Sequence, residues 1–323
     1  MAAFIRLNLE PQYLNYTRAD YRSFNRAVAN NALRRLDQVA SVERYYPVAS
    51  AVNYATAYDA GKIFADKGLD NAAIGFGAFV SDRNDTDFVD IAGKRTVFPS
   101  PLPNRYVRAG AVAKGFWDGY RDSAGRSPLA FHFLGLGAPI LVGIACLYAW
   151  GTRLVTFDAT SPIADAISGS LYTSGPTFLK IDTTAAATRL VSSARERWRC
   201  PCPFCHTYVR KRPFDYPAGR RWWDKQRRGR EILQRDLKAG GGLFRAYPLL
   251  SQSAGGSLYA DTRLARIGHN HWALKDITRK VRAHASTRRS LERYLDRIVI
   301  RYEKAAAADK YADAIRFLYE TAL

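Results

Sequence analysis

The stretch that decides the fold is LAFHFLGLGAPILVGIACLYAWGTRLVTFD, residues 129–158. As far as Gly151 it is almost free of charge and long enough to span a bilayer, but Pro139 and four glycines divide it into shorter pieces. We expect a buried strand, LAFHFLGL, and then a helix that begins at Pro139 and ends before Gly151. A second strand, RLVTF, follows and ends at Asp158. Strand, helix and strand in this order predict a parallel βαβ unit rather than a membrane span.

The same alternation of strands and helices appears upstream of this unit, with a less distinct hydrophobic pattern. Helices are expected over residues 18–41, 52–68 and 111–125, and strands over residues 4–9, 44–50 and 71–82. Residues 83–104, which include Pro101 and Pro103, are expected to form loops and turns. About five β/α steps therefore precede residue 160, which predicts a wound α/β architecture equivalent to an incomplete barrel.

The composition indicates a folded protein with a polyanionic partner. Of the 323 residues, 47% are apolar, which excludes disorder as the overall state. Lysine and arginine number 49 against 29 acidic residues, so the net charge is +20 and nucleic acid is the first candidate partner. The N-terminus, MAAFIRLNLEPQ, lacks the pattern of a signal peptide, so we expect a cytoplasmic protein.

A densely basic segment follows the α/β region. Between His206 and Gly240 there are eleven lysines or arginines and four acidic residues, interleaved with Trp222 and Trp223. Arginines suit phosphate contacts and tryptophans suit stacking on an unpaired base, so the segment is a candidate nucleic-acid-binding insertion. The candidate phosphate ligands are Arg220, Arg221, Arg227, Arg228 and Arg230. The alternative is a solvated basic loop without a partner.

The strongest local motif is RCPCPFCH, which places Cys200, Cys202 and Cys205 within reach of one tetrahedral ion. Three thiols so close together predict a structural zinc site, because without a metal they are a redox liability. The alternative is a loop with free cysteines. The candidate fourth ligands are His206, His269 and His271. The first adjoins Cys205 and is sterically awkward, so the segment GHNHWALKD, residues 268–276, is the better source.

Several of these motifs, in this order along the chain, resemble the tRNA-guanine transglycosylase superfamily. Within it, the sequence is most similar in character to the DNA-modifying 7-deazaguanine transglycosylases (DpdA-type). HFLGLGAP, residues 132–139, is similar to a strand-loop-helix signature near the end of the family's barrel. TFDATSP, residues 156–162, is similar to the strand end that bears the catalytic aspartate. CPCPFC is similar to the family's zinc loop, and His269 with Asn270 to the dipeptide that supplies the fourth zinc ligand. AIGFGAF, residues 73–79, is similar to the loop that holds the heterocyclic base.

The resemblance implies a TIM barrel with a zinc-binding subdomain that exchanges guanine in a polynucleotide for a 7-deazaguanine such as preQ0 or preQ1. Asp158 directly follows a predicted parallel strand, where barrel enzymes assemble their sites. Its carboxylate is expected to attack the ribose anomeric carbon and hold a covalent glycosyl intermediate until the incoming base displaces it. The alternative role for Asp158 is to cap the turn at Thr160 and Ser161.

The resemblance also assigns the other site residues. The base is expected to contact Gly75, Gly77 and Ala78. The structural zinc is expected to be bound by Cys200, Cys202, Cys205 and His269.

The sequence also departs from the family pattern. It has no DSGG-type segment, which in the family supplies a second aspartate as general acid/base, and its first residues resemble the helix after a mid-barrel strand. We therefore expect a barrel that is incomplete at the N-terminus. Either an upstream segment or a second polypeptide completes it, or catalysis has been lost. Ala49 stands where the family commonly has a base-reading glutamine. SPIADAISG, residues 161–169, replaces the arginine- and asparagine-rich run of the tRNA branch, which favours DNA over tRNA.

These observations predict three parts. Residues 1–185 form the partial (β/α) barrel, 186–272 the zinc-binding subdomain with its basic insertion, and 273–323 C-terminal helices that pack on the barrel. The core positions expected in these helices are Leu291, Leu295, Ile298 and Ile300. The preferred function is guanine/7-deazaguanine exchange in DNA. The alternatives are the same exchange on tRNA and a non-catalytic, zinc-stabilised nucleic-acid-binding subunit.

Overall fold

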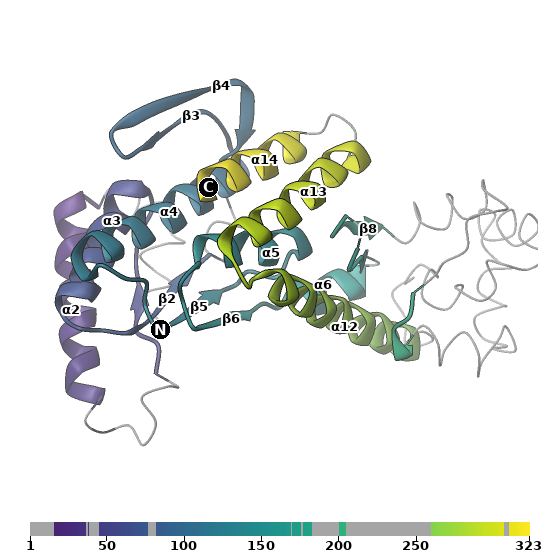
Figure 1. Ribbon diagram of the computed structural model, residues 1–323, viewed down its shortest axis with the longest axis horizontal. Coiled ribbons are helices and arrows are strands. Elements are labelled where there is room, and N and C mark those ends of the chain that lie inside the picture. Colours follow the sequence, from purple (N-terminus) through teal and green to yellow (C-terminus); the bar gives the residue numbers. More distant parts are fainter. Residues whose placement is uncertain are drawn as a thin grey trace, which may run out of the picture. The chain divides into compact units, whose positions relative to one another are not determined.

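The chain divides into two compact units. The computed structural model describes residues 16–36, 38, 45–76, 82–168, 170–175, 177–182, 200–204, 260–306 and 310–323 (Figure 1). The first unit comprises Met1–Ala159 and Lys280–Leu323, and the second comprises Thr160–Arg279. The strand expected over residues 4–9 lies outside the described residues.

A four-stranded parallel sheet organises the first unit, with its strands in the order β1, β2, β5, β6. These strands are β1 (Val48–Ala49), β2 (Asn71–Gly75), β5 (Ala130–Leu134) and β6 (Leu154–Asp158). Consecutive members of the sheet pair with one another, and a helix lies between them along the chain. The predicted mixed α/β class and the βαβ unit that ends at Asp158 are therefore confirmed, but the four described strands form an open sheet and not a closed barrel.

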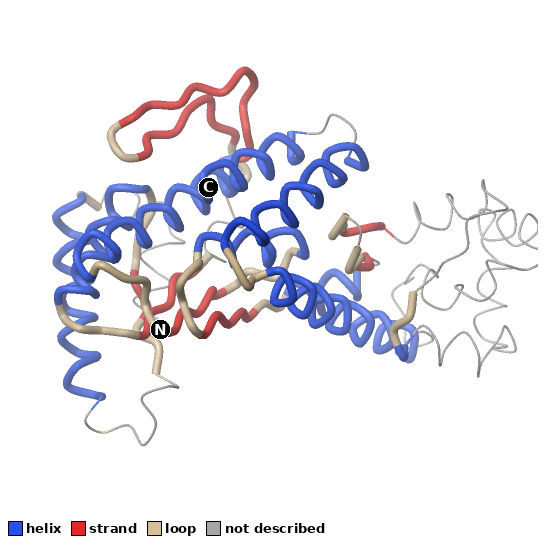
Figure 2. Tube along the Cα trace, viewed as in Figure 1, coloured by secondary structure: helices blue, strands red, loops and turns tan. Residues whose placement is uncertain are grey.

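Three helices connect these strands: α3 (Tyr54–Asp66), α4 (Asn104–Ala124) and α5 (Pro139–Tyr148). Figure 2 shows them on one side of the sheet. Phe131 and Phe133 of β5 are buried on this side, where the Trp117 ring of α4 lies 4.2 Å and 5.7 Å from theirs. Because side chains alternate along a strand, His132 lies on the opposite face of the sheet.

Helix α5 begins at Pro139, as the sequence predicts, and has only 10 residues. A proline is tolerated in the first turn because its missing N–H has no partner within the helix there. Among the residues that the structure describes, no helix is long and apolar enough to cross a membrane.

Helices α3 and α4 pack at very short distance. A Cβ atom built on Gly119 of α4 would lie 2.0 Å from the backbone oxygen of Tyr58, and one on Gly115 would lie 2.3 Å from that of Tyr54. Only glycine allows the two backbones to approach this closely. The contact holds α3 beside α4, whose Phe116 and Trp117 rings pack on Phe131 of β5.

Helix α2 (Arg18–Leu36) packs on α3 and holds the end of β1. The buried Asn25 side chain accepts a hydrogen bond from the Ser50 N–H and donates one to the Ser50 carbonyl, at 2.9 Å and 2.8 Å. Both backbone groups of Ser50 are thus satisfied directly after the strand.

Residues 83–104 correct the sequence expectation of loops and turns. They form an antiparallel hairpin of β3 (Asp85–Ile91) and β4 (Lys94–Pro103). Ala92 and Gly93 both have positive φ, 52° and 79°, which is the geometry of a tight two-residue hairpin turn. The prolines of β4 suggested a loop, but they are tolerated because both strands of a two-stranded sheet are edges.

The C-terminal helices α13 (Arg288–Ala306) and α14 (Lys310–Ala322) belong to the first unit, where α14 packs on α4 and α5. The buried residues of α13 are Leu291, Leu295, Ile298 and Val299. The expectation of a buried Ile300 is wrong, because this side chain is 36% exposed. The helical period brings Val299, four residues after Leu295, to the core instead.

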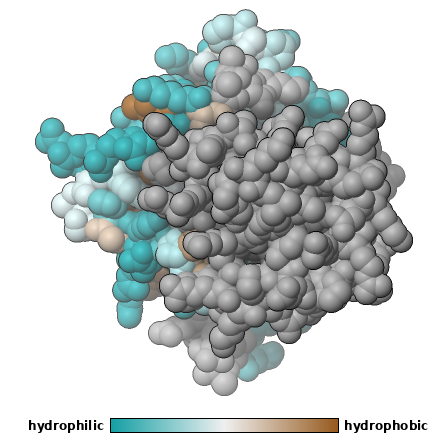
Figure 3. Space-filling model, turned by 90° about the vertical axis from the view of Figure 1, so that its right-hand side faces the viewer, coloured by the Kyte–Doolittle hydropathy of each residue, from teal (hydrophilic) through white to brown (hydrophobic). Residues whose placement is uncertain are grey.

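The second unit contains α6 (Ser161–Ser168), the antiparallel pair β7 (Ser170–Tyr172) and β8 (Lys180–Asp182), and most of α12 (Ala260–His284). Residues 200–204 lie in this unit as well. In Figure 3 the visible surface of the described residues is mainly hydrophilic, in keeping with the charge of the chain.

Candidate metal centre and strand-end site

The structure brings together three predicted metal ligands. Cys200 and Cys202 come from the short segment 200–204, and His269 comes from α12. The His269 Nδ1 atom lies 3.5 Å from Cys200 Sγ and 3.3 Å from Cys202 Sγ, and all three ligand atoms lie within 4.8 Å of one another. Cys202 and His269 are buried. This group can hold a metal ion.

The His269 ring is oriented for this role by its other nitrogen. Nε2 lies 2.9 Å from the Tyr172 carbonyl oxygen, an acceptor, so Nε2 carries a proton and Nδ1 faces the sulfurs. Burial lowers the pKa of His269, but the Cys200 and Cys202 sulfurs raise it by more, so that the pKa reaches about 9 in the metal-free site. A metal ion must therefore displace a proton from Nδ1 at neutral pH.

Asn270, the residue after His269, fixes α12 against the rest of the second unit. It is fully buried, and its Oδ1 accepts a hydrogen bond from Tyr172 N at 2.9 Å. Its Nδ2 donates to the carbonyls of Pro162 and Ser170, both at 3.1 Å. Tyr172 therefore contacts both residues of the dipeptide, its N–H through Asn270 and its carbonyl through His269. The dipeptide positions the metal ligand through this strand.

Phe204 contacts α12 one residue before the ligand. A Cβ atom built on Gly268 would lie 2.3 to 2.6 Å from atoms of the Phe204 ring. The glycine therefore provides the space in which the ring lies against the helix backbone. This contact couples the cysteine segment to the helix that carries His269.

The other candidate metal ligands are Cys205, His206 and His271, and the structure describes only the last of them. Cys205 and His206 lie outside the described residues, so the fourth ligand stays a prediction. His271 is exposed and does not belong to the cluster that the described residues form.

Asp158 lies at the carboxyl end of β6, with its side chain 58% exposed. Its Oδ1 accepts a hydrogen bond of 2.7 Å from the backbone N–H of Gly135. Gly135 has φ 77°, a conformation that favours glycine, and it directly follows β5. The carboxylate is thus held by the backbone of the neighbouring β5 loop.

His132 is a neighbour of this carboxylate that the sequence reading did not single out. Its Nε2 lies 3.6 Å from Asp158 Oδ2, and its Nδ1 lies 2.7 Å from Thr156 Oγ1. The Thr156 hydroxyl donates to the Phe131 carbonyl at 3.5 Å, so its oxygen can accept a hydrogen bond from Nδ1–H, and Nε2 is the ring nitrogen that faces Asp158. The imidazole is 19% exposed, so it is open to one side.

The strand register places the predicted base-binding glycine in the same row as Asp158. Gly75 pairs with Leu134, and Leu134 pairs with Asp158, so Gly75 and Asp158 lie two strand spacings apart, about 10 Å. Both share the sheet face of His132 because strand partners point to the same side. Gly77 and Ala78 lie outside the described residues. Ala49 is fully buried.

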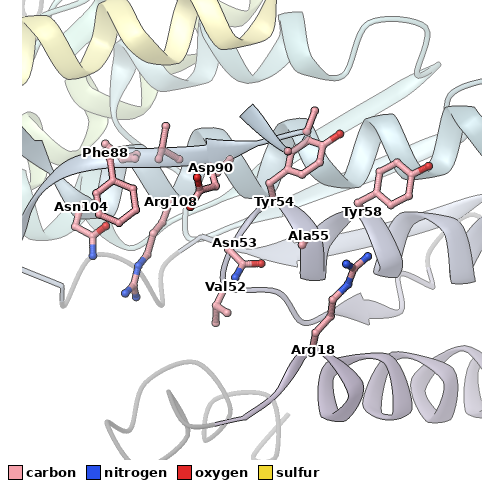
Figure 4. Close-up of a pocket in the computed structure, with 15 residues that line it drawn as sticks. Arg18, Val52, Asn53, Tyr54, Ala55, Tyr58, Phe88, Asp90, Asn104 and Arg108 are labelled. Carbon is pink, nitrogen blue, oxygen red and sulfur yellow. The ribbon is translucent and has the colours of Figure 1, made fainter. Parts of the chain in front are cut away.

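A separate pocket of about 770 Å³ lies beside the hairpin β3–β4, at the first turns of α3 and α4. Figure 4 shows Tyr54, Tyr58 and Phe88 along its walls together with Arg18 and Arg108. Arg18 forms an ion pair with Asp59, and Arg108 with Asp82. These charges already have partners, and no predicted site residue lines this pocket.

The arginines of the predicted basic insertion, from Arg220 to Arg230, lie outside the described residues.

Comparison with known proteins gives no match: no family model, no curated protein and no solved structure is detectably similar to the chain.

Proposed function

We propose that the chain is a pentosyltransferase that exchanges guanine in DNA for a 7-deazaguanine such as preQ0. The observation that supports this most is the position of Asp158. Its carboxylate lies at the end of a parallel strand, beside an imidazole and in the row of Gly75. The resemblance of the sequence motifs gives this carboxylate the role of nucleophile.

In this proposal a carboxylate oxygen of Asp158 forms a bond to the deoxyribose anomeric carbon while the bond from that carbon to guanine N9 breaks. The electron pair leaves with the purine, and His132, as the imidazolium with its Nδ1–H towards Thr156 Oγ1, donates the Nε2 proton to the leaving base and becomes neutral. The incoming 7-deazaguanine then loses its N9 proton to the neutral His132 and attacks the same carbon. This step releases the carboxylate and restores the protonated Nε2.

We also propose that the sheet is an arc of a (β/α)₈ barrel. Two observations support this. The strands follow one another in chain order, with their helices on one side, which is the pattern of a barrel sector. The other face carries His132, Thr156 and Asp158, and Leu154 of β6 is 44% exposed. Further strands, from an upstream segment or a second polypeptide, would pair with the edge and enclose this face.

The donor set of the metal centre fits zinc. Two thiolates and one imidazole are ligands that Zn²⁺ prefers, and Cys205 would complete a closed tetrahedral shell. When bound, zinc would cross-link the cysteine segment to α12 and stabilise the second unit. Cys200, Cys202 and His269 would hold it, while Asn270 and Tyr172 keep the histidine in place.

The experiment is mass spectrometry of nucleosides from DNA and tRNA of cells that express the protein together with whatever completes its barrel. The variant Asp158→Asn should remove the modified base, whereas Asp90→Asn, with a similarly exposed side chain at 56%, should not. A 7-deazaguanine found only in tRNA would support the tRNA alternative. A protein that binds zinc and DNA but leaves both nucleic acids unmodified would support the binding-subunit alternative.

A further inference from the structure

The solvent-exposed side of α13 carries a row of positively charged side chains along most of the helix. Arg289, Arg293, Arg297 and Arg301 recur at every fourth residue and are all exposed, and the exposed Lys304 follows. Each step of four residues advances about 6 Å along the helix and turns about 40° around it. We call these five residues the α13 basic face. It lies opposite Leu291, Leu295 and Ile298, which are buried.

The acidic residues of α13 do not neutralise this face. The helix has three, Glu292, Asp296 and Glu303. Glu292 pairs with Arg288 at 2.7 Å, and both Asp296 and Glu303 pair with Arg316 of α14. In the part of the chain that the structure describes, none of the four arginines of the basic face forms an ion pair.

This arrangement costs helix stability. Like charges four residues apart repel one another, and the basic face contains three such successive pairs. Helix α2 provides a contrast within the same unit, because Arg18 and Arg22, also four residues apart, share the carboxylate of Asp59. Arg293 and Arg297 use only their Nε–H, each on the backbone carbonyl four residues earlier, which leaves four N–H donors on each guanidinium.

We propose that the α13 basic face binds the phosphate backbone of a polynucleotide. A row of guanidinium groups that lacks acidic partners matches a chain of phosphates, and arginine forms charge-assisted, bidentate hydrogen bonds with phosphate oxygens. The surface is distinct from the basic insertion at Arg220–Arg230. Binding at the α13 basic face involves the same class of partner as the proposed function, a polynucleotide, but it does not depend on catalysis. The binding proposal and the proposal of base exchange can therefore be tested and rejected separately.

A polynucleotide fits this surface better than an anionic membrane does. A helix that lies in a membrane interface inserts an apolar face among the lipids. The apolar face of α13 already packs on α5 and α14. Among the described residues of α13, the one exposed large apolar side chain is Ile300, which is 36% exposed.

The test compares two variants of the full-length protein that lose the same number of charges. In the first, Arg289, Arg293, Arg297 and Arg301 are replaced by Gln, which keeps helix propensity. In the second, the exposed residues Arg22, Arg26, Arg34 and Arg35 of α2 are replaced by Gln. Binding to a fluorescent DNA duplex of mixed sequence is measured at several salt concentrations, and thermal unfolding is recorded for both.

We expect the α13 variant to lower the salt slope of duplex binding by about 2 to 4, since each lost phosphate contact contributes about 0.9. Its affinity at physiological salt should fall at least about tenfold, while its thermal unfolding midpoint should stay the same or rise, because repulsion is relieved. The α2 variant should change the slope by less than about 1. Equal slopes in wild type and α13 variant, or equal losses in both variants, would overturn the proposal. So would loss of binding to phosphatidylserine vesicles with DNA binding intact.

Discussion

His132 and Asp158 lie on adjacent parallel strands with His132 Nε2 3.6 Å from Asp158 Oδ2. The pair arises from the register, in which His132 lies opposite Thr156 and Leu134 lies opposite Asp158. All four side chains therefore share one sheet face. In the proposed function His132 is the group that takes the acid/base role beside Asp158.

Replacement of His132 by Gln should lower the rate of base exchange by about 10²- to 10⁴-fold, the usual contribution of a general acid/base. Loss of zinc or of DNA binding is not expected. The measurement is exchange kinetics over a pH range with the completed barrel.

Thr156→Val serves as the control for orientation of the same ring. It removes the hydroxyl that lies 2.7 Å from Nδ1 but keeps the imidazole, so a smaller loss of exchange rate is expected. A His132→Gln variant with wild-type exchange rates would show that the proton comes from another group.

Zinc affinity should increase with pH. The pKa of His269 is raised to about 9 in the metal-free site, so at neutral pH the imidazole is protonated and must lose its proton before Nδ1 can bind the metal. Below pH 9 each unit of decrease should therefore weaken binding about tenfold through this histidine alone. Competition with a chromophoric chelator between pH 6 and 8 measures the slope. A binding constant independent of pH would exclude His269 as a ligand.

The sequence predicts the βαβ unit well because its pieces differ sharply in pattern. Pro139 marks the start of α5, and the apolar run LAFHFLGL can be buried only as a strand beneath helices. Residues 83–104 could not be recognised as a hairpin, because Pro101 and Pro103, like other prolines, normally interrupt sheets. Their tolerance depends on an isolated two-stranded sheet, which is a tertiary property.

At the candidate sites, the sequence shows which residues have suitable chemistry more reliably than it shows which of them lie next to one another in the fold. Cys200, Cys202 and His269 are recognisable from their chemistry, and the structure brings them together. His132 was missed although a signal exists: it lies two residues before the end of its strand, as Thr156 does before Asp158. These equal positions along the two strands bring His132 close to Asp158 only because the strands pair in parallel without a shift in register.

Replacement of Gly119 by Ala should destabilise the first unit by about 2 kcal/mol or more, because the new methyl group would meet the Tyr58 backbone oxygen at 2.0 Å and force α3 from α4. Gly68→Ala is a suitable comparison. Its added Cβ meets nothing within 4 Å, but its φ of 67° makes it cost about 1 to 2 kcal/mol through the backbone alone. Chemical denaturation followed by circular dichroism should rank Gly119→Ala as the more destabilising change. The reverse order would contradict the close approach of the two helices.

The contact between Phe204 and Gly268 should control metal retention. Gly268→Ala places a methyl group 2.3 to 2.6 Å from atoms of the Phe204 ring, so the ring must move and take the cysteine segment with it, away from His269. We expect this variant to release zinc to a chelator faster than the wild type. Phe204 is 40% exposed, so Phe204→Ala alone should have a small effect. In the double variant the clash is absent, and zinc retention should return to the level of Phe204→Ala. If the double variant loses zinc as fast as Gly268→Ala, the effect of the alanine acts through α12 itself and not through the ring.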